Sequence, residues 1–122
     1  MNEQAEALRR RTKRFALDVI ALVRTLPPGE PSWTIGGQLT RSGTSVGANY
    51  RSACRARSHA DFVAKIALVE EESDEAGFWL EIVKETGLGA ADAVEPLLKE
   101  ADELTAIFAR STMTARQFAN RH

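Results

Sequence analysis

The sequence of 122 residues predicts an all-α protein, an antiparallel up-and-down bundle of four helices. Two observations support this prediction. In four separate segments the apolar residues recur at steps of three and four, which is the spacing of one helix face. Proline, glycine and helix-capping residues mark the boundaries between these segments, and the connections are short enough for neighbouring helices to fold back on each other.

The first helix is predicted over about residues 3–26. Its seam is uninterrupted: Leu8, Thr12, Phe15, Val19, Leu22 and Leu26. Pro27 and Pro28 end it, because proline lacks an amide hydrogen and disfavours helical geometry in the residue before it. Ser32 is then expected to be the N-cap of a second helix, over about residues 32–57.

The second helix carries two adjacent stripes. The expected seam is Ile35, Leu39, Ser42, Val46, Asn49 and Ala53, and the neighbouring stripe of small residues is Gly36, Thr40, Gly43 and Gly47. Glycine inside a helix costs up to about 1 kcal/mol relative to alanine, so the stripe predicts a compensating close contact, within the bundle or between chains. Asn49, as a polar residue on the seam, is predicted to fix helix register rather than to form a functional site.

Ser58 and Asp61 have the spacing of a capping box and predict a third helix over about residues 59–85. Its seam is Phe62, Ile66, Val69, Ser73, Ala76, Leu80 and Val83. Trp79, beside this seam, is expected to be mostly buried at a helix or subunit contact. The fourth helix, over about residues 92–118, has the seam Leu97, Ala101, Leu104, Phe108, Ser111, Ala115 and Phe118.

Composition predicts one soluble domain over residues 1–122, with no membrane partner. The longest apolar run, residues 15–23, is interrupted by Asp18 and is far shorter than the roughly 20 residues that a bilayer requires. The one cysteine, Cys54, cannot form an internal disulfide, which agrees with a cytoplasmic protein.

The charges are divided unevenly along the chain. Residues 1–61 carry ten basic against five acidic side chains, and residues 62–122 carry six against twelve. In a bundle these halves attract each other. If the second and third helices fold back around Ser58, Arg41 faces Glu75, which predicts an ion pair between helices or between subunits.

The residues give no sign of catalysis. Ser42 and Ser45 have no histidine placed to activate them, and the acidic run at residues 70–75 lacks the Glu-x-x-His pairs of di-iron bundles. We therefore expect no enzymatic activity, no metal, no cofactor and no small-molecule substrate.

A basic cluster is the clearest candidate for an external function. It comprises Arg9, Arg10, Arg11, Lys13 and Arg14, and Arg51, Arg55 and Arg57 could extend it. Two interpretations stay open: a solvated face near the acidic half of a neighbouring chain, or a surface that contacts nucleic-acid phosphates. Sparse aromatic residues nearby weigh against base stacking.

Several motifs in order resemble a known family. They are Gln38-Leu39-x-Arg41-Ser42-x-x-Ser45-Val46-x-x-Asn49, preceded by Leu26-Pro27, then Asp61-Phe62 and Glu72-x-Asp74-Glu75-x-x-Phe78-Trp79-Leu80. This pattern is similar to the bacterial four helix bundle protein family, first noticed in intervening sequences of large-subunit ribosomal RNA genes. After Asn49 the chain reads Tyr50-Arg51-Ser52-Ala53 where many members read Ile-Ala-Glu-Gly, so a role tied to that glutamate does not carry over.

The resemblance implies a cyclic homopentamer of four-helix bundles without established enzymatic activity. The family resembles a related branch, the accessory proteins of diversity-generating retroelements. Proteins of that branch share the pentameric barrel and bind nucleic acid and a reverse transcriptase. The sequence thus predicts a non-enzymatic oligomeric interaction module, and the alternative is a nucleic-acid-binding accessory factor that uses the basic surface.

Overall fold

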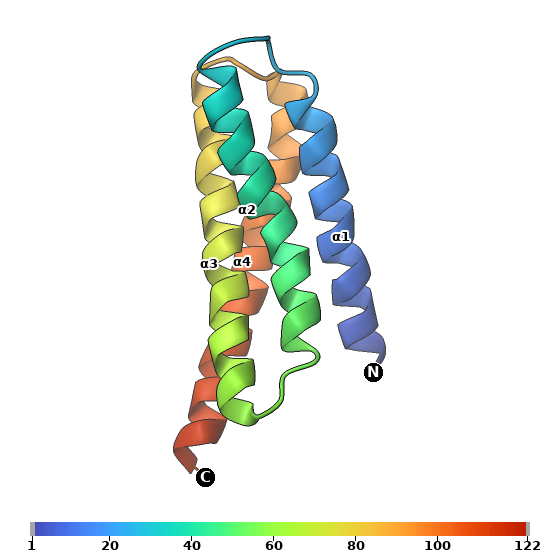
Figure 1. Ribbon diagram of the computed structural model, residues 1–122, viewed down its shortest axis with the longest axis vertical. Helices are drawn as coiled ribbons and strands as arrows, with labels where there is room; N and C mark the ends of the chain where they lie inside the picture. Colours follow the sequence, from blue (N-terminus) through green and yellow to red (C-terminus); the bar gives the residue numbers. More distant parts are fainter. Residues whose placement is uncertain (1, 122) are drawn as a thin grey trace.

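The computed structural model describes the backbone of residues 2–121 and the side chains of residues 2–118. This part of the chain contains four helices and no strand: α1 (Glu3–Val23), α2 (Ser32–Ala53), α3 (His59–Glu85) and α4 (Ala91–Arg121). Figure 1 shows the helices side by side, with the chain reversing at each of the three connections. The arrangement is consistent with a four-helix bundle in which α4 extends past the ends of its neighbours.

Two predicted helices end earlier than expected. α1 stops at Val23 instead of about residue 26, and α2 stops at Ala53 instead of about residue 57. In both cases the chain continues in tighter turns, where an amide bonds the carbonyl three residues back, as between Leu26 and Val23 at 3.1 Å. The α3 bounds are as predicted, and α4 begins one residue earlier and continues beyond residue 118.

The expected cap of α2 is wrong. Pro31 occupies the N-cap position, and Ser32 is the first helical residue and is buried without a capping bond. Glu30 satisfies this helix end instead, because its carboxylate accepts from the Thr34 amide at 2.9 Å and from the Thr34 hydroxyl. Both bonds lower the pKa of Glu30, and the bond from the hydroxyl has the larger effect.

The cap of α3 is confirmed in part. The Asp61 amide donates to Ser58 Oγ at 3.0 Å, as predicted. In a capping box the Asp61 carboxylate would accept from the Ser58 amide. Here it accepts instead from the amide of the preceding residue, Arg57, at 3.1 Å. The Asp61 carboxylate also pairs with Lys65. The bond from Lys65 is the main reason why the pKa of Asp61 is lowered, and the bond from the Arg57 amide adds to it.

The predicted seams of α1 and α3 form the core, together with most of the α4 seam. On α2 the expected seam is wrong at one position. Tyr50 is buried and stacks at a tilt on Phe108 with ring centroids 5.3 Å apart, whereas Asn49 is half-buried. The Asn49 amide donates to the Ser45 carbonyl of its own helix at 2.8 Å, and this bond does not fix the register between helices.

The glycine stripe of α2 lies against α1 of the same chain. A Cβ atom added to Gly43 would lie 2.9 Å from a methyl group of Val19, and one added to Gly36 would lie 3.1 Å from Val23. At Gly47 the nearest atoms belong to Thr12, at 3.4 Å. The close contact that the stripe predicted therefore forms within the bundle, which is the first of the two alternatives.

We predict that Gly43→Ala destabilises the protein by about 1–3 kcal/mol, because the β-branched Val19 has little freedom to move away. The control is Gly37→Ala, where nothing lies within 4 Å of the added Cβ. This variant should gain up to about 1 kcal/mol from helix propensity. Urea unfolding measures both changes, and equal stabilities of the two variants would contradict the assigned contact.

Candidate nucleic-acid interface

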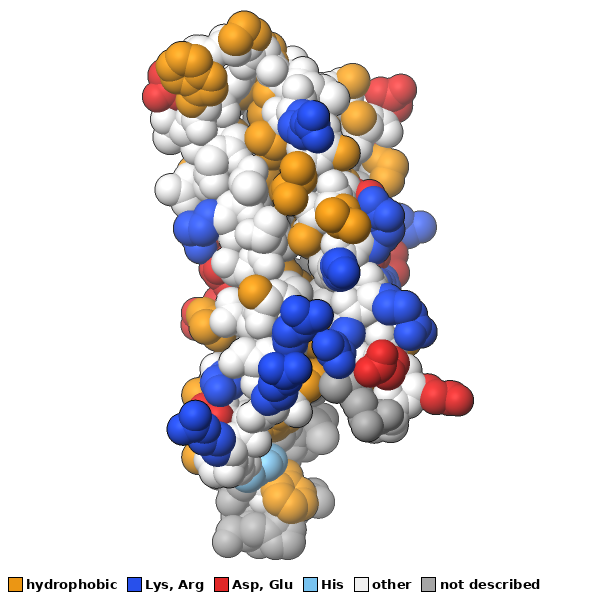
Figure 2. Space-filling model, turned by 45° about the vertical axis from the view of Figure 1, so that its right-hand side comes forward, with side chains coloured by type: hydrophobic (Ala, Val, Ile, Leu, Met, Phe, Trp, Pro, Cys, Tyr) orange, Lys and Arg blue, Asp and Glu red, His pale blue; other side chains and the backbone are white. Residues whose placement is uncertain are grey.

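A basic cleft lies between α1 and α2. It has a volume of about 420 Å³, and its rim carries Arg9, Arg10 and Lys13 from α1 and Arg51 from α2. The remaining lining residues are Glu6, Ala16, Thr44, Gly47 and Ala48. Figure 2 shows Lys and Arg side chains gathered on the lower half of this face.

The helical spacing explains how these cations come together. Arg9 lies four residues before Lys13 and Arg10 lies three residues before it, so both share the side of α1 on which Lys13 lies. Gly47 brings the two helices close, since its missing side chain leaves room for the backbone of Thr12. The small residues between the rims keep the cleft open.

The charge of the cleft is largely uncompensated within the chain. Glu6 is its single carboxylate, 3.5 Å from the Arg9 guanidinium. Arg10, Lys13 and Arg51 take part in no ion pair among the side chains of residues 2–118. Four cations therefore line the cleft against one carboxylate.

The expected single cluster of cations is divided by the structure. Arg11 turns to α4, where its guanidinium donates to Glu100 at 2.7 and 2.8 Å and to Glu103 at 2.9 Å. The bond to Glu100 is the main reason why the pKa of Arg11 is raised. Arg14 pairs with Asp18 of its own helix at 3.0 Å. Neither side chain lines the cleft.

The two other predicted cations lie beyond the end of α2. Arg55 and Arg57 are exposed in the connection between α2 and α3, and neither lines the cleft. Among the predicted extensions of the cluster, only Arg51 belongs to it.

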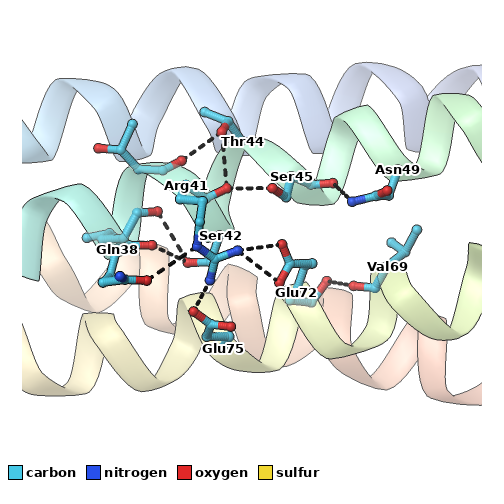
Figure 3. A network of polar contacts seen from close by, with 12 residues as sticks. Gln38, Arg41, Ser42, Thr44, Ser45, Asn49, Val69, Glu72 and Glu75 are labelled. Carbon is cyan, nitrogen blue, oxygen red and sulfur yellow. Dashed lines mark hydrogen bonds and ion pairs between the residues drawn. The ribbon is translucent and has the colours of Figure 1, made fainter.

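Arg41 joins α2 to α3, as Figure 3 shows. Its guanidinium lies 3.0 Å from Glu72 and also pairs with Glu75. The predicted Arg41–Glu75 pair thus forms between helices of one chain. The bond from Arg41 and a second bond from the Trp79 indole, at 3.1 Å, lower the pKa of Glu75. Trp79 itself is partly buried and packs against the core.

The hydroxyl groups of α2 bond within their own helix. Ser42 donates to the Gln38 carbonyl at 2.9 Å and Ser45 to the Arg41 carbonyl at 2.6 Å (Figure 3). Each satisfies its polarity locally, which is common for serine in helix interiors. This arrangement gives neither serine a general base.

A second hollow lies at the open end of the bundle and has a volume of about 720 Å³. Its lining is mainly apolar and includes Leu8, Phe62 and Phe118. It exists because α1 packs far less on α4 than on α2. The His59 imidazole donates from Nε2 to the Ala115 carbonyl at 2.8 Å, which ties α4 to the start of α3 there.

Within the described part of the chain, no three His, Cys, Asp or Glu side chains are grouped so that they could hold a metal ion. None of the described helices has a stretch long and apolar enough to cross a membrane. The basic cleft, by contrast, suits an anionic group such as a phosphate.

The fold and the cleft define a four-helix protein with a basic face rather than a recognisable catalytic centre. The model of the 23S rRNA-intervening sequence protein family matches residues 6–110, and the chain belongs to this family. No curated protein matches the chain.

A solved structure supports the same assignment. It is a protein of unknown function from the S23 ribosomal protein family of Bacteroides thetaiotaomicron VPI-5482. It is 28% identical, with a TM-score of 0.79, and the match covers 85% of this chain and 96% of that chain. Neither similarity assigns an activity.

We predict that the contribution of Glu75 to stability depends on pH. Its pKa is lowered in the folded state, so its stabilisation is complete above the unfolded value of about 4.3 and is lost as the pH falls through the folded value. Glu75→Gln should therefore be less stable than the wild type at pH 7, and the difference should be smaller at pH 3.

Urea unfolding at both pH values measures this effect. Glu71→Gln serves as the control, because Glu71 is exposed on the same helix and takes no part in the Arg41 network. A difference between wild type and Glu75→Gln that is the same at both pH values would contradict the role of the ion pair.

Proposed function

We propose that the protein is a non-enzymatic interaction module that binds the phosphate backbone of a nucleic acid in the α1–α2 cleft. The observation that supports this proposal is the convergence of Arg9, Arg10, Lys13 and Arg51 on one cleft with a single carboxylate. Clustered cations repel one another, and binding of a polyanion relieves this repulsion and releases the counterions of the phosphates.

The cleft favours phosphate contacts over recognition of particular bases. Its rim is made of arginine and lysine, whereas its floor consists of small side chains that offer few groups to a base edge. The binding is thus expected to depend strongly on salt and weakly on sequence. A role beside ribosomal RNA or a nucleic-acid enzyme would agree with the family to which the chain belongs.

Replacing Arg10, Lys13 and Arg51 by Gln should weaken binding to a labelled RNA or DNA at least about tenfold at low salt. The slope of log affinity against log salt should fall by about 2, since each lost phosphate contact removes about 0.7–0.9. Sequence preference should stay unchanged. Fluorescence anisotropy at several salt concentrations measures all three quantities.

The matched control replaces three exposed cations outside the cleft, Arg24, Lys99 and Arg116, by Gln. Both triple variants lose three positive charges. A difference in their affinity for nucleic acid therefore reports the position of the charges and not their number. The proposal fails if the two variants bind equally well. It also fails if the wild type binds neither RNA nor DNA at low salt.

We also propose that the chain assembles into a closed homo-oligomer, a pentamer if it follows the families that it resembles. The supporting observation is the exposure of large apolar side chains on α1 and α3, which do not contact each other: Leu17 and Ile20 on α1, and Leu68 and Phe78 on α3. One chain cannot cover both patches itself. A head-to-tail contact between two copies would join them, and such contacts form a ring when the rotation between successive copies closes.

Phe78 is 51% exposed, so Phe78→Lys should shift the assembly to smaller species and leave helicity unchanged. The control is Met113→Lys, which changes an equally exposed apolar residue on α4. Light scattering and circular dichroism measure the outcome. A wild type that is monomeric at micromolar concentration would overturn the assembly proposal.

A further inference from the structure

Trp33 is the most exposed of the large apolar side chains among the described residues, at 70% of its surface. It lies in the first turn of α2 and lines an apolar hollow of about 420 Å³. Leu26, Pro27 and Gly37 also line this hollow. An indole in this position offers a flat face to a partner.

Trp33 and the basic cleft lie on the same side of α2. Arg51 follows Trp33 by eighteen residues, which is about five full helical turns, so the two side chains leave the helix in the same direction. The rise of about 1.5 Å per residue places them about 27 Å apart along the axis. Figure 2 shows apolar side chains on the upper half of this face and cations on the lower half.

The surface between the two sites is lined by small side chains. Gly37, Thr40, Thr44 and Ala48 lie on the same side of α2 between Trp33 and Arg51. The first two line the apolar hollow and the other two line the basic cleft. Between the two hollows, α2 thus offers a row of small side chains. We call this face of α2 the groove, with cations at one end and an exposed indole at the other.

We infer that this groove binds a single-stranded nucleic acid, with phosphates at Arg10, Lys13 and Arg51 and an unstacked base on the Trp33 indole. The inference rests on the proposed nucleic-acid function and adds the strand type. A positively charged groove combined with an aromatic stacking surface is the usual arrangement in proteins that bind single strands. A length of about 27 Å fits the roughly 4–16 nucleotides that such domains cover.

A duplex fits the groove less well. Its bases are stacked inside the helix, so an exposed indole meets their faces only at the ends, whereas a single strand presents them along its length. Phosphate contacts alone would serve either form equally. Trp33 is therefore the residue that distinguishes the two.

The test uses a fluorescently labelled twelve-nucleotide oligo(dT) or oligo(U) and a duplex of the same length, each titrated with the full chain. Trp33→Ala should weaken single-strand binding about 5- to 100-fold, the usual effect of removing one stacking residue, and leave the salt slope unchanged. Duplex binding should not change. Trp33→Phe should restore most of the affinity, because phenylalanine also stacks.

A second readout follows the indole directly. The chain has two tryptophans, so a Trp79→Phe background leaves Trp33 as the only tryptophan reporter. Its emission should have the wavelength of an exposed indole and be quenched as unlabelled oligo(dT) or oligo(U) is added. This variant also serves as the reference for the affinities.

The outcomes separate this inference from the proposed function. If Trp33→Ala binds the single strand as tightly as the wild type while the cleft variant is weakened, the groove inference fails and phosphate binding stands. Tighter binding of the duplex than of the single strand overturns the inference in the same way. If neither nucleic acid binds, both proposals fail. Blue-shifted Trp33 emission that the oligonucleotide does not change would show that a second copy covers the indole. This result would also overturn the groove inference.

Discussion

The close approach of α1 to α2 is the constraint on which the rest of the structure depends. Val19 lies where a side chain at Gly43 would be, and Thr12 lies at contact distance, 3.4 Å, from the place of a Cβ atom at Gly47. Glycine weakens α2 by up to about 1 kcal/mol at each position, so the packing of α1 must offset this cost. The same contact sets which side of α1 faces outward, and with it the position of the cations that line the cleft.

The ion pairs then divide the charges into two groups. Arg11 and Arg41 meet carboxylates of α4 and α3, so the basic and acidic halves of the chain attract each other across the bundle. These pairs are partly exposed, and each is worth at most about 1 kcal/mol. Their larger effect is on the remaining surface, because they take Glu72 and Glu100 away from the cations of the cleft.

The sequence predicted the core well because a buried helix face follows directly from apolar spacing. The prediction was wrong at Asn49 and Tyr50, because the buried face shifts there by one residue, which is a turn of about 100°. The aromatic ring of Tyr50 is buried in place of the polar amide of Asn49. The cleft could not be predicted, because the sequence does not fix how α1 rotates on α2. Arg10 and Arg11 are adjacent in sequence, yet only Arg10 lines the cleft, whereas Arg11 pairs with carboxylates of α4.

The cations of the cleft contribute little to holding the fold together. The core is formed by apolar side chains on the opposite side of α1, and the ion pairs of Arg11 and Arg41, which join helices, lie outside the cleft. Two like charges about 4 Å apart in water repel by about 1 kcal/mol, so four cations beside the single carboxylate of Glu6 cost stability instead of adding to it. Uncharged polar residues would serve the folded chain as well at these positions. The bundle therefore does not depend on the basic side of the groove, which agrees with the anionic partner that we propose.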